Sequence, residues 1–167
     1  IHKMGSTQDS NVPLDCWHST NIRIETMTSK QVQVVKDYFK HCVDGKQTHR
    51  IGEYFAEDTM IHRPDCNKII NGLSEFEAML KVHVTDRYES LETTFQKIVE
   101  DGHQVVVALT HRAKGADEWK GYQLNGENVT WTSLTYFRFN DEGKVVEEIV
   151  ERNELSMALQ LGLKLTD

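Results

Sequence analysis

The spacing of hydrophobic residues changes once along the chain, near Asp86. Before this point, apolar residues recur every three to four positions, which is typical of amphipathic helices. The pattern predicts three helices, which begin near the candidate N-cap residues Ser29, Thr48 and Ser74. Gly45 follows the first helix, where a glycine commonly ends a helix. The first half of the chain is therefore predicted to be mainly helical.

After this point, apolar and polar residues alternate, which is typical of strands with one buried face. Together with a short earlier segment, the pattern predicts strands at 59–62, 91–99, 103–112, 129–139 and 144–152. The pairs Asp101-Gly102 and Asn125-Gly126 are typical of hairpin turns. The segment 113–121 fits a loop or an edge strand, and a short helix is predicted at 155–161. Helices followed by hairpin-linked strands predict an α+β domain with an antiparallel sheet.

Length and composition agree with one such domain. The chain has 167 residues, 38% of them hydrophobic and 27% charged, which suits a single globular unit with its own core. Residues 1–27 are polar and are predicted to be an extension, partly derived from cloning because Met4-Gly5-Ser6 is typical of such sequences. The domain itself is predicted to span 28–167.

Net charge and cysteine content limit which classes of partner and which cellular compartment are expected. A net charge of −7, with no dense basic cluster, argues against nucleic acid as a partner. No apolar run approaches the roughly 20 residues that span a bilayer, so no membrane partner is predicted. The three cysteines, Cys16, Cys42 and Cys66, are too scattered for a disulfide framework or a zinc site. We therefore expect a soluble, cytoplasmic protein.

Four segments resemble one known superfamily. These are VVKDY at 34–38, FAED at 55–58, FRFNDEGKVV at 137–146 and QLG at 160–162. In this order and spacing they resemble the ketosteroid isomerase branch of the nuclear transport factor 2-like superfamily, and even more the SnoaL-like polyketide cyclases. The resemblance covers residues 29–162.

The resemblance implies a cone-shaped fold, in which N-terminal helices pack on a strongly curved antiparallel sheet and enclose an apolar pocket. It also implies a homodimer formed through the outer face of the sheet. Relatives of this kind use no metal or organic cofactor and carry out general acid/base chemistry on small apolar carbonyl compounds. We therefore expect no cofactor and a small apolar metabolite as the ligand.

The catalytic residues of these relatives are only partly present. At the position of the isomerase base, before Pro64, the chain has Arg63. Tyr38 matches the helix-one tyrosine that donates to the oxyanion, whereas Thr135 replaces the protonated aspartate. At the positions of the cyclase aspartate and histidine the chain has Val150 and Thr135. Neither known mechanism is predicted to operate unchanged.

Alternation along the strands indicates which other side chains face the pocket. Glu148 shares a face with two valines, where burial would raise its pKa and suit it to proton transfer near neutral pH. The alternative is that Glu148 faces solvent or pairs with Arg138. The residues predicted to bind substrate are Trp119, Trp131, Ser133, Thr135, Phe137, Val150 and Arg63.

Two further residues complete the candidate catalytic set. His62 ends the first strand and would form an acid/base pair with Glu148, unless it is simply an exposed turn residue. Tyr38 is either a pocket donor or a core tyrosine. His111 fits an ordinary surface or pairing role. No histidines and acids fall at a zinc-binding spacing, so no metal site is predicted.

Three functions remain open at this point. The first is a cofactor-independent cyclase or isomerase acting on a small apolar carbonyl or epoxide-like metabolite. The second is a non-catalytic binding or dimerisation module with the same cone. The third is a limonene-type epoxide hydrolase, whose Asp-Arg-Asp cluster would need Asp65 with Arg138 or Arg152. Two titratable groups meeting at one point of an apolar pocket would favour an enzyme.

Overall fold

The first helical region forms where the apolar spacing predicts it. The computed structural model describes residues 28–63, 69–115, 118–119, 122–123 and 128–164. Helix α1 (Lys30–Tyr38) begins after Ser29, whose side-chain oxygen accepts a hydrogen bond from the backbone N–H of Val32. The helix runs directly into a π-helical segment, η1 (Phe39–Asp44), which the sequence did not reveal.

Gly45 ends this helix as predicted, but not through a left-handed backbone. Its φ is −80°, whereas the next residue, Lys46, has a φ of +56°. A Cβ atom at Gly45 would lie 2.7 Å from the backbone oxygen of His41. Glycine is therefore required here because the chain passes close to the preceding helical turn.

The rest of this half of the chain contains short helical elements and two strands. They are the 3₁₀ helix η2 (Thr48–Glu53), β1 (Phe55–His62), β2 (Ile70–Asn71), α2 (Leu73–Lys81) and the π-helical segment η3 (Val82–Asp86). The strand predicted at 59–62 thus begins four residues earlier. The ends of these elements bring β1 and α2 together, since the N–H of Gly72 donates to the backbone oxygen of Thr59.

The second half is a series of strands followed by a short helix. They are β3 (Ser90–Asp101), β4 (Gln104–Lys114), β7 (Val129–Phe139), β8 (Val145–Arg152) and α3 (Glu154–Gln160). Two further strands, β5 (Glu118–Trp119) and β6 (Tyr122–Gln123), form a separate small hairpin. The turn predicted at Asn125-Gly126 lies outside the described residues.

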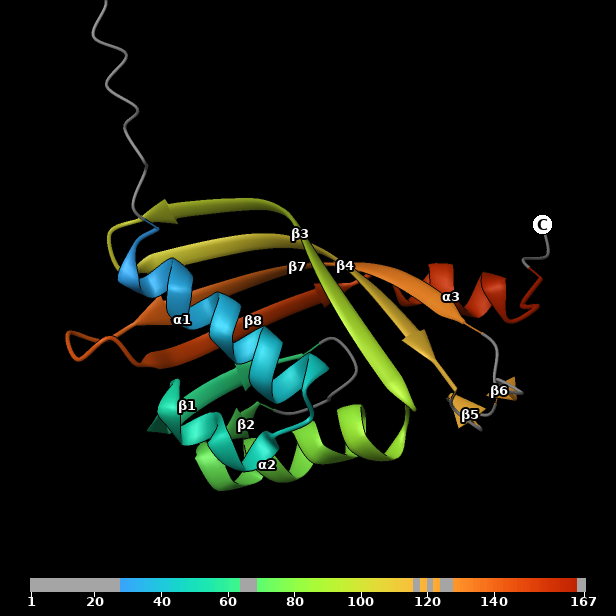
Figure 1. Ribbon diagram of the computed structural model, residues 1–167, viewed down its shortest axis with the longest axis horizontal. Coiled ribbons are helices and arrows are strands. Elements are labelled where there is room, and N and C mark those ends of the chain that lie inside the picture. Colours follow the sequence, from blue (N-terminus) through green and yellow to red (C-terminus); the bar gives the residue numbers. More distant parts are fainter. Residues whose placement is uncertain (1–27, 64–68, 116–117, 120–121, 124–127, 165–167) are drawn as a thin grey trace, which may run out of the picture.

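The strands of the main sheet lie in the order β2-β1-β8-β7-β4-β3. Neighbouring strands are antiparallel except β1 and β8, which are parallel. Parallel neighbours need a long connection, and here about half of the chain lies between these two strands. Figure 1 shows that the sheet is strongly curved and that α1 lies across one of its faces. The predicted α+β class, with helices on a curved sheet, is confirmed.

An aromatic cluster joins the helices to this face of the sheet. The Tyr38 ring centroid lies 4.9 Å from that of Phe55 and 6.2 Å from that of Phe137. Phe55 also packs edge-on against Phe76 of α2, at 5.0 Å. Such tilted and edge-to-face contacts are favourable beyond simple burial. The cluster fixes α1 and α2 over β1 and β7 and thereby shapes the space beside it.

Among the helices of the described residues, none has the length and the apolar character needed to cross a membrane.

Candidate functional site

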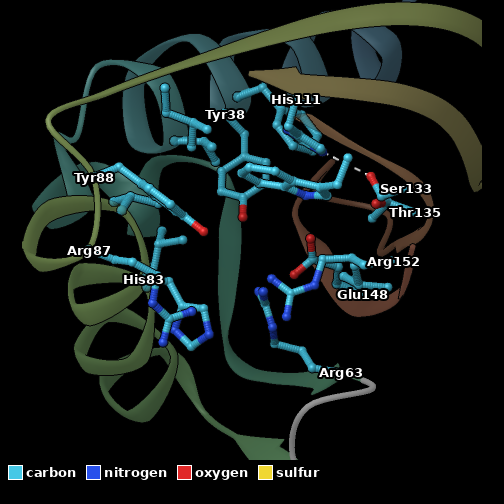
Figure 2. A pocket seen from close by; sticks show the side chains of 17 residues that line it. Tyr38, Arg63, His83, Arg87, Tyr88, His111, Ser133, Thr135, Glu148 and Arg152 are labelled. Carbon is cyan, nitrogen blue, oxygen red and sulfur yellow. Dashed lines mark hydrogen bonds between the residues drawn. The ribbon is translucent and has the colours of Figure 1, made fainter. Parts of the chain in front are cut away.

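A cavity of about 70 Å³ lies between the helices and the inner face of the sheet (Figure 2). Residues from both halves of the chain line it. Most of its wall is apolar, formed by Phe39, Val43, Leu80, Val84, Leu91 and Trp131. Ten further side chains of the described lining are polar or titratable, and they come from both halves of the chain. This combination is typical of sites that bind and orient small molecules.

Glu148 is the only acidic side chain among the described residues that line the cavity. It points inward from the middle of β8 and is 2% exposed. Burial raises the pKa of its carboxyl group to about 7, although the charges of Arg63 and Arg152 act in the opposite direction. Its Oε2 atom is buried and makes no hydrogen bond to a described residue. A carboxylate with one unbonded oxygen in an apolar cavity can accept a proton from a ligand.

Three arginines belong to the cavity lining, and two of them, Arg63 and Arg152, act on this acid. Arg63 follows β1, Arg87 follows η3, and Arg152 ends β8; all three line the cavity. Arg152 also binds Glu154, with 2.8 Å between its Nη2 and the Oε1 atom. Figure 2 shows Arg63 and Arg152 converging on the Glu148 carboxyl group. Guanidinium groups outnumber carboxylates in the described cavity lining, which favours anions in a chain whose net charge is −7.

Two tyrosines add neutral hydroxyl groups. Tyr38 of α1 and Tyr88 both line the cavity and are largely buried. Burial is the main cause that raises the pKa of each phenol above its ordinary value. Both remain protonated at neutral pH, and Figure 2 shows their hydroxyl groups directed into the cavity. Each can donate a hydrogen bond to a ligand oxygen.

Strand alternation positions the remaining predicted residues as expected. Trp131, Ser133 and Thr135 project inward from β7, and Val150 projects inward from β8. In the pairing of the two strands, Thr135 lies opposite Val150 and Ser133 lies opposite Arg152. Side chains on directly opposed residues share one face of a sheet. The register of β7 and β8 therefore assembles this side of the cavity.

His111 is the main residue of the cavity for which the sequence indicated another role. It projects inward from β4, is 6% exposed, and stacks on Trp131 with ring centroids 5.1 Å apart. Burial lowers its pKa to about 4, with Arg152 and Arg63 acting in the same direction, so the ring is neutral at physiological pH. The alternation Val105-Val107-Leu109 in β4 was a signal that the next inward residue is His111.

His62 does not reach the cavity. Its neighbour Ile61 is fully buried, so His62 lies on the opposite face of β1. There its Nε2 atom is 3.2 Å from Oε1 of Glu147, and Oε2 of the same carboxylate accepts a hydrogen bond from Arg138. The predicted pairing of His62 with Glu148 is therefore wrong. Arg138, the alternative partner considered for Glu148, binds the neighbouring carboxylate instead.

Of three further residues named from the sequence, one does not line the cavity and two cannot be compared with the described part of the chain. Phe137 is fully buried in the aromatic cluster and does not line the cavity, because Tyr38 and Phe39 pack over it. Trp119 belongs to β5, but its side chain is outside the described part of the chain. Asp65, which an epoxide hydrolase cluster would require, also lies outside the described residues.

Within the described part of the chain, no three histidine, cysteine or acidic side chains group together as metal ligands do. The only described cysteine, Cys42, is fully buried, and burial is the main cause that raises the pKa of its thiol to about 12. A thiol with so high a pKa is a poor nucleophile and a poor metal ligand at neutral pH. The polar chemistry of the site therefore centres on Glu148, the arginines and His111.

Comparison with known proteins identifies the family. The family model of the SnoaL-like polyketide cyclases matches residues 33–161, which is most of the domain. The chain belongs to the SnoaL-like polyketide cyclase family. Among curated proteins, none matches this SnoaL-like chain at a significant level.

Solved structures agree on the fold. A SnoaL-like polyketide cyclase from Agrobacterium tumefaciens is 16% identical, with a TM-score of 0.66, and the match covers 80% of this chain and 99% of that one. IdmH from Streptomyces antibioticus is 20% identical, with a TM-score of 0.69 over 81% and 100% of the two chains. An NTF2-like protein of unknown function from Burkholderia pseudomallei is 18% identical, with a TM-score of 0.65 over 81% and 99%. These likenesses confirm the predicted nuclear transport factor 2-like fold.

Proposed function

We propose that this SnoaL-like protein is a cofactor-independent enzyme that moves a proton next to a carbonyl group of a small molecule, in an isomerisation or a cyclisation. Glu148 is the general base. The observation that supports this most directly is its buried carboxyl group, which lines the cavity and whose Oε2 atom has no hydrogen-bond partner among the described residues. A pKa near 7 balances the ionised fraction against the strength of the base at physiological pH.

In this proposal, Arg63 and Arg152 stabilise the ionised Glu148 before the proton transfer and the enolate oxygen of the substrate after it. Before reaction, Arg63 and Arg152 face an ionised Glu148. When Glu148 takes the proton, the negative charge moves to the carbonyl oxygen of the substrate, which becomes an enolate oxygen. We place the carbonyl oxygen beside the same guanidinium groups, so that the charge would move within one fixed field without reorganisation of solvent. Tyr38 supports the enolate oxygen as a neutral donor.

The cavity wall indicates the class of substrate. Its apolar and aromatic side chains suit a small, largely apolar body, whereas the arginines suit a carbonyl or anionic oxygen. Substrate-binding roles are proposed for Trp131, Thr135, Val150 and Arg63. This differs from the relatives' donor set, since guanidinium groups replace the protonated aspartate of the isomerases.

Hydrogen exchange in heavy water tests this proposal. Acetophenone and 4-acetylbenzoate carry exchangeable methyl protons next to a carbonyl group, and NMR follows their loss. We expect exchange above the buffer background, with a rate that falls about tenfold per pH unit below about pH 7 and levels off above it, because only ionised Glu148 is a base. Exchange of both probes at the buffer rate would contradict the proposal and favour a non-catalytic binding module.

We also propose that the protein forms a homodimer through the outer face of the sheet. Side chains on this face form an apolar row across four strands, since Val99 pairs with Val106, Val106 with Tyr136, and Tyr136 with Ile149. Leu134, two positions before Tyr136 on the same face of β7, is 58% exposed. A second copy of the chain would bury this row against its own counterpart, as a two-fold interface requires.

Changing Leu134 to glutamate is therefore expected to convert the dimer to a monomer, because the substitution would bury a charge in the interface. Light scattering coupled to size-exclusion chromatography measures the mass of each form. Lys81→Glu, on the exposed side of α2, is the matched control and should leave the mass unchanged. A wild-type protein that is monomeric at micromolar concentration would contradict the proposal.

A further inference from the structure

A chain of hydrogen bonds runs from the edge of the fold to the cavity. Both carboxylate oxygens of Asp44 lie close to Thr93, with Oδ2 3.0 Å from the backbone nitrogen and Oδ1 2.7 Å from the hydroxyl oxygen. The same hydroxyl oxygen is 3.1 Å from Nδ1 of His111. On the other side of the ring, Nε2 is 2.9 Å from the hydroxyl oxygen of Ser133 (dashed line in Figure 2). The proposed function uses none of these four groups as the base.

Counting hydrogens fixes the direction of every bond in this chain. The carboxylate of Asp44 only accepts, so Thr93 donates its single hydroxyl hydrogen there. The oxygen of Thr93 can then only accept from His111, whose Nδ1 must carry the ring hydrogen. A neutral ring has one such hydrogen, which leaves Nε2 as an acceptor. Ser133 must therefore donate its hydroxyl hydrogen to His111.

The direction of these hydrogen bonds determines what the hydroxyl group of Ser133 offers to a ligand. Ser133 lines the cavity, and its only hydrogen is already committed. Its oxygen therefore presents lone pairs to a ligand and has nothing left to donate. Arg63 and Arg152, near Glu148, have the opposite character, since guanidinium groups donate and never accept.

We propose that Ser133 is a specificity-determining residue that accepts a hydrogen bond from a hydroxyl group of the substrate, and that His111, Thr93 and Asp44 hold it in this orientation. Because Trp131, together with the His111 and Tyr88 rings stacked on it, makes the cavity wall aromatic beside this position, the proposed substrate class is a hydroxyaryl carbonyl compound. A cationic donor is disfavoured by the arginines. The inference rests on the proposed function only for the placement of the carbonyl group at Glu148.

The tautomer of His111 tests the chain without any ligand. Long-range ¹H–¹⁵N NMR spectra of the full-length protein distinguish a ring protonated at Nδ1 from one protonated at Nε2. We expect the Nδ1–H form in the wild type. In Thr93→Val, which keeps the shape but removes the hydroxyl group, we expect the hydrogen to move to Nε2. A wild-type ring protonated at Nε2 would overturn the proposal.

Binding of matched probes tests the specificity. The probes are 3- and 4-hydroxyacetophenone, their methoxy counterparts and acetophenone, and NMR titration gives each Kd. We expect at least one hydroxy compound to bind about tenfold more tightly than its methoxy counterpart, as one net hydrogen bond allows. Ser133→Ala should reduce this ratio to about one, whereas Thr132→Ala, its exposed neighbour on the outer face, should leave it unchanged. No preference in the wild type would overturn the proposal.

Two variants distinguish the specificity role of Ser133 from a purely structural one. Thr93→Val should lose the preference for hydroxy compounds although Thr93 does not line the cavity, which a purely structural role would not predict. Glu148→Gln should keep the preference while losing exchange activity. If exchange fails in the wild type but the preference is present, the proposed function is wrong and the specificity role stands.

Discussion

Replacing Glu148 with glutamine is expected to lower the rate of proton exchange by about 10²- to 10⁴-fold, the usual contribution of a general base. The amide has nearly the same shape as the carboxyl group, so it fills the same place among Arg63, Arg152 and Val150. It cannot take up a proton at neutral pH. Binding of a carbonyl probe should therefore change much less than the rate does.

The neighbouring Glu147 offers a matched control on the same strand. Its side chain lies on the outer face, where it binds Arg138 and His62, so Glu147→Gln removes an acid without touching the cavity. We expect this variant to keep the wild-type rate and its dependence on pH. A Glu148→Gln variant with more than a tenth of the wild-type rate would rule out Glu148 as the base.

The raised pKa of the same carboxyl group should also make the free energy of unfolding depend on pH. The pKa of Glu148 rises from an ordinary value of 4.5 to about 7 on folding. Between these pH values the folded chain holds a proton that the unfolded chain releases, so the free energy of unfolding falls as pH rises through this window. At 1.36 kcal/mol per pKa unit, the loss amounts to about 3 kcal/mol above pH 7.

Glutamine at position 148 removes this loss because it never ionises. We expect Glu148→Gln to be no more stable than the wild type at pH 4.5. Between pH 4.5 and pH 8, the free energy of unfolding of the variant minus that of the wild type should increase by about 3 kcal/mol. Urea unfolding of both proteins at a series of pH values measures the difference, in which the titration of all other groups cancels. A difference that does not change with pH would show that Glu148 has the same pKa in the folded and unfolded chains.

Alternation along single strands could be read from the sequence, and it found the part of the cavity wall that β7 and β8 form. Trp131, Ser133 and Thr135 in β7 and Glu148 and Val150 in β8 face inward as predicted. In each case, buried neighbours two positions away identify the face, and this information is local. The helix beginning at Ser29 could also be predicted, since its cap is a contact within one turn.

Alternation along β1, by contrast, places His62 away from the cavity. Thr59 and Ile61 are the inward residues of that strand, so the residue that follows them must face outward. A strand predicted from only four residues gives too short a pattern to fix its buried face. The error in the prediction therefore concerns the face on which a side chain lies, and not the existence of the strand.

Other features depend on contacts between distant segments, which no local pattern encodes. The parallel pairing of β1 with β8 joins Ile61 to Glu148 across about half of the chain. The contact of Asp44 with Thr93 depends on where η1 meets β3. Arg152 reaches the cavity because β8 ends opposite Ser133. The sequence contains these residues, but only the three-dimensional arrangement gives them neighbours.

The alternation in β7 also separates two kinds of change that natural variation can make. Ser133 and Thr135 touch only the ligand side, while Leu134 and Tyr136 touch only the outer side. A relative can thus acquire a new substrate by altering every second residue while its mode of assembly is inherited unchanged. Conversely, a change at Leu134 or Tyr136 can alter the outer face while the cavity is inherited unchanged.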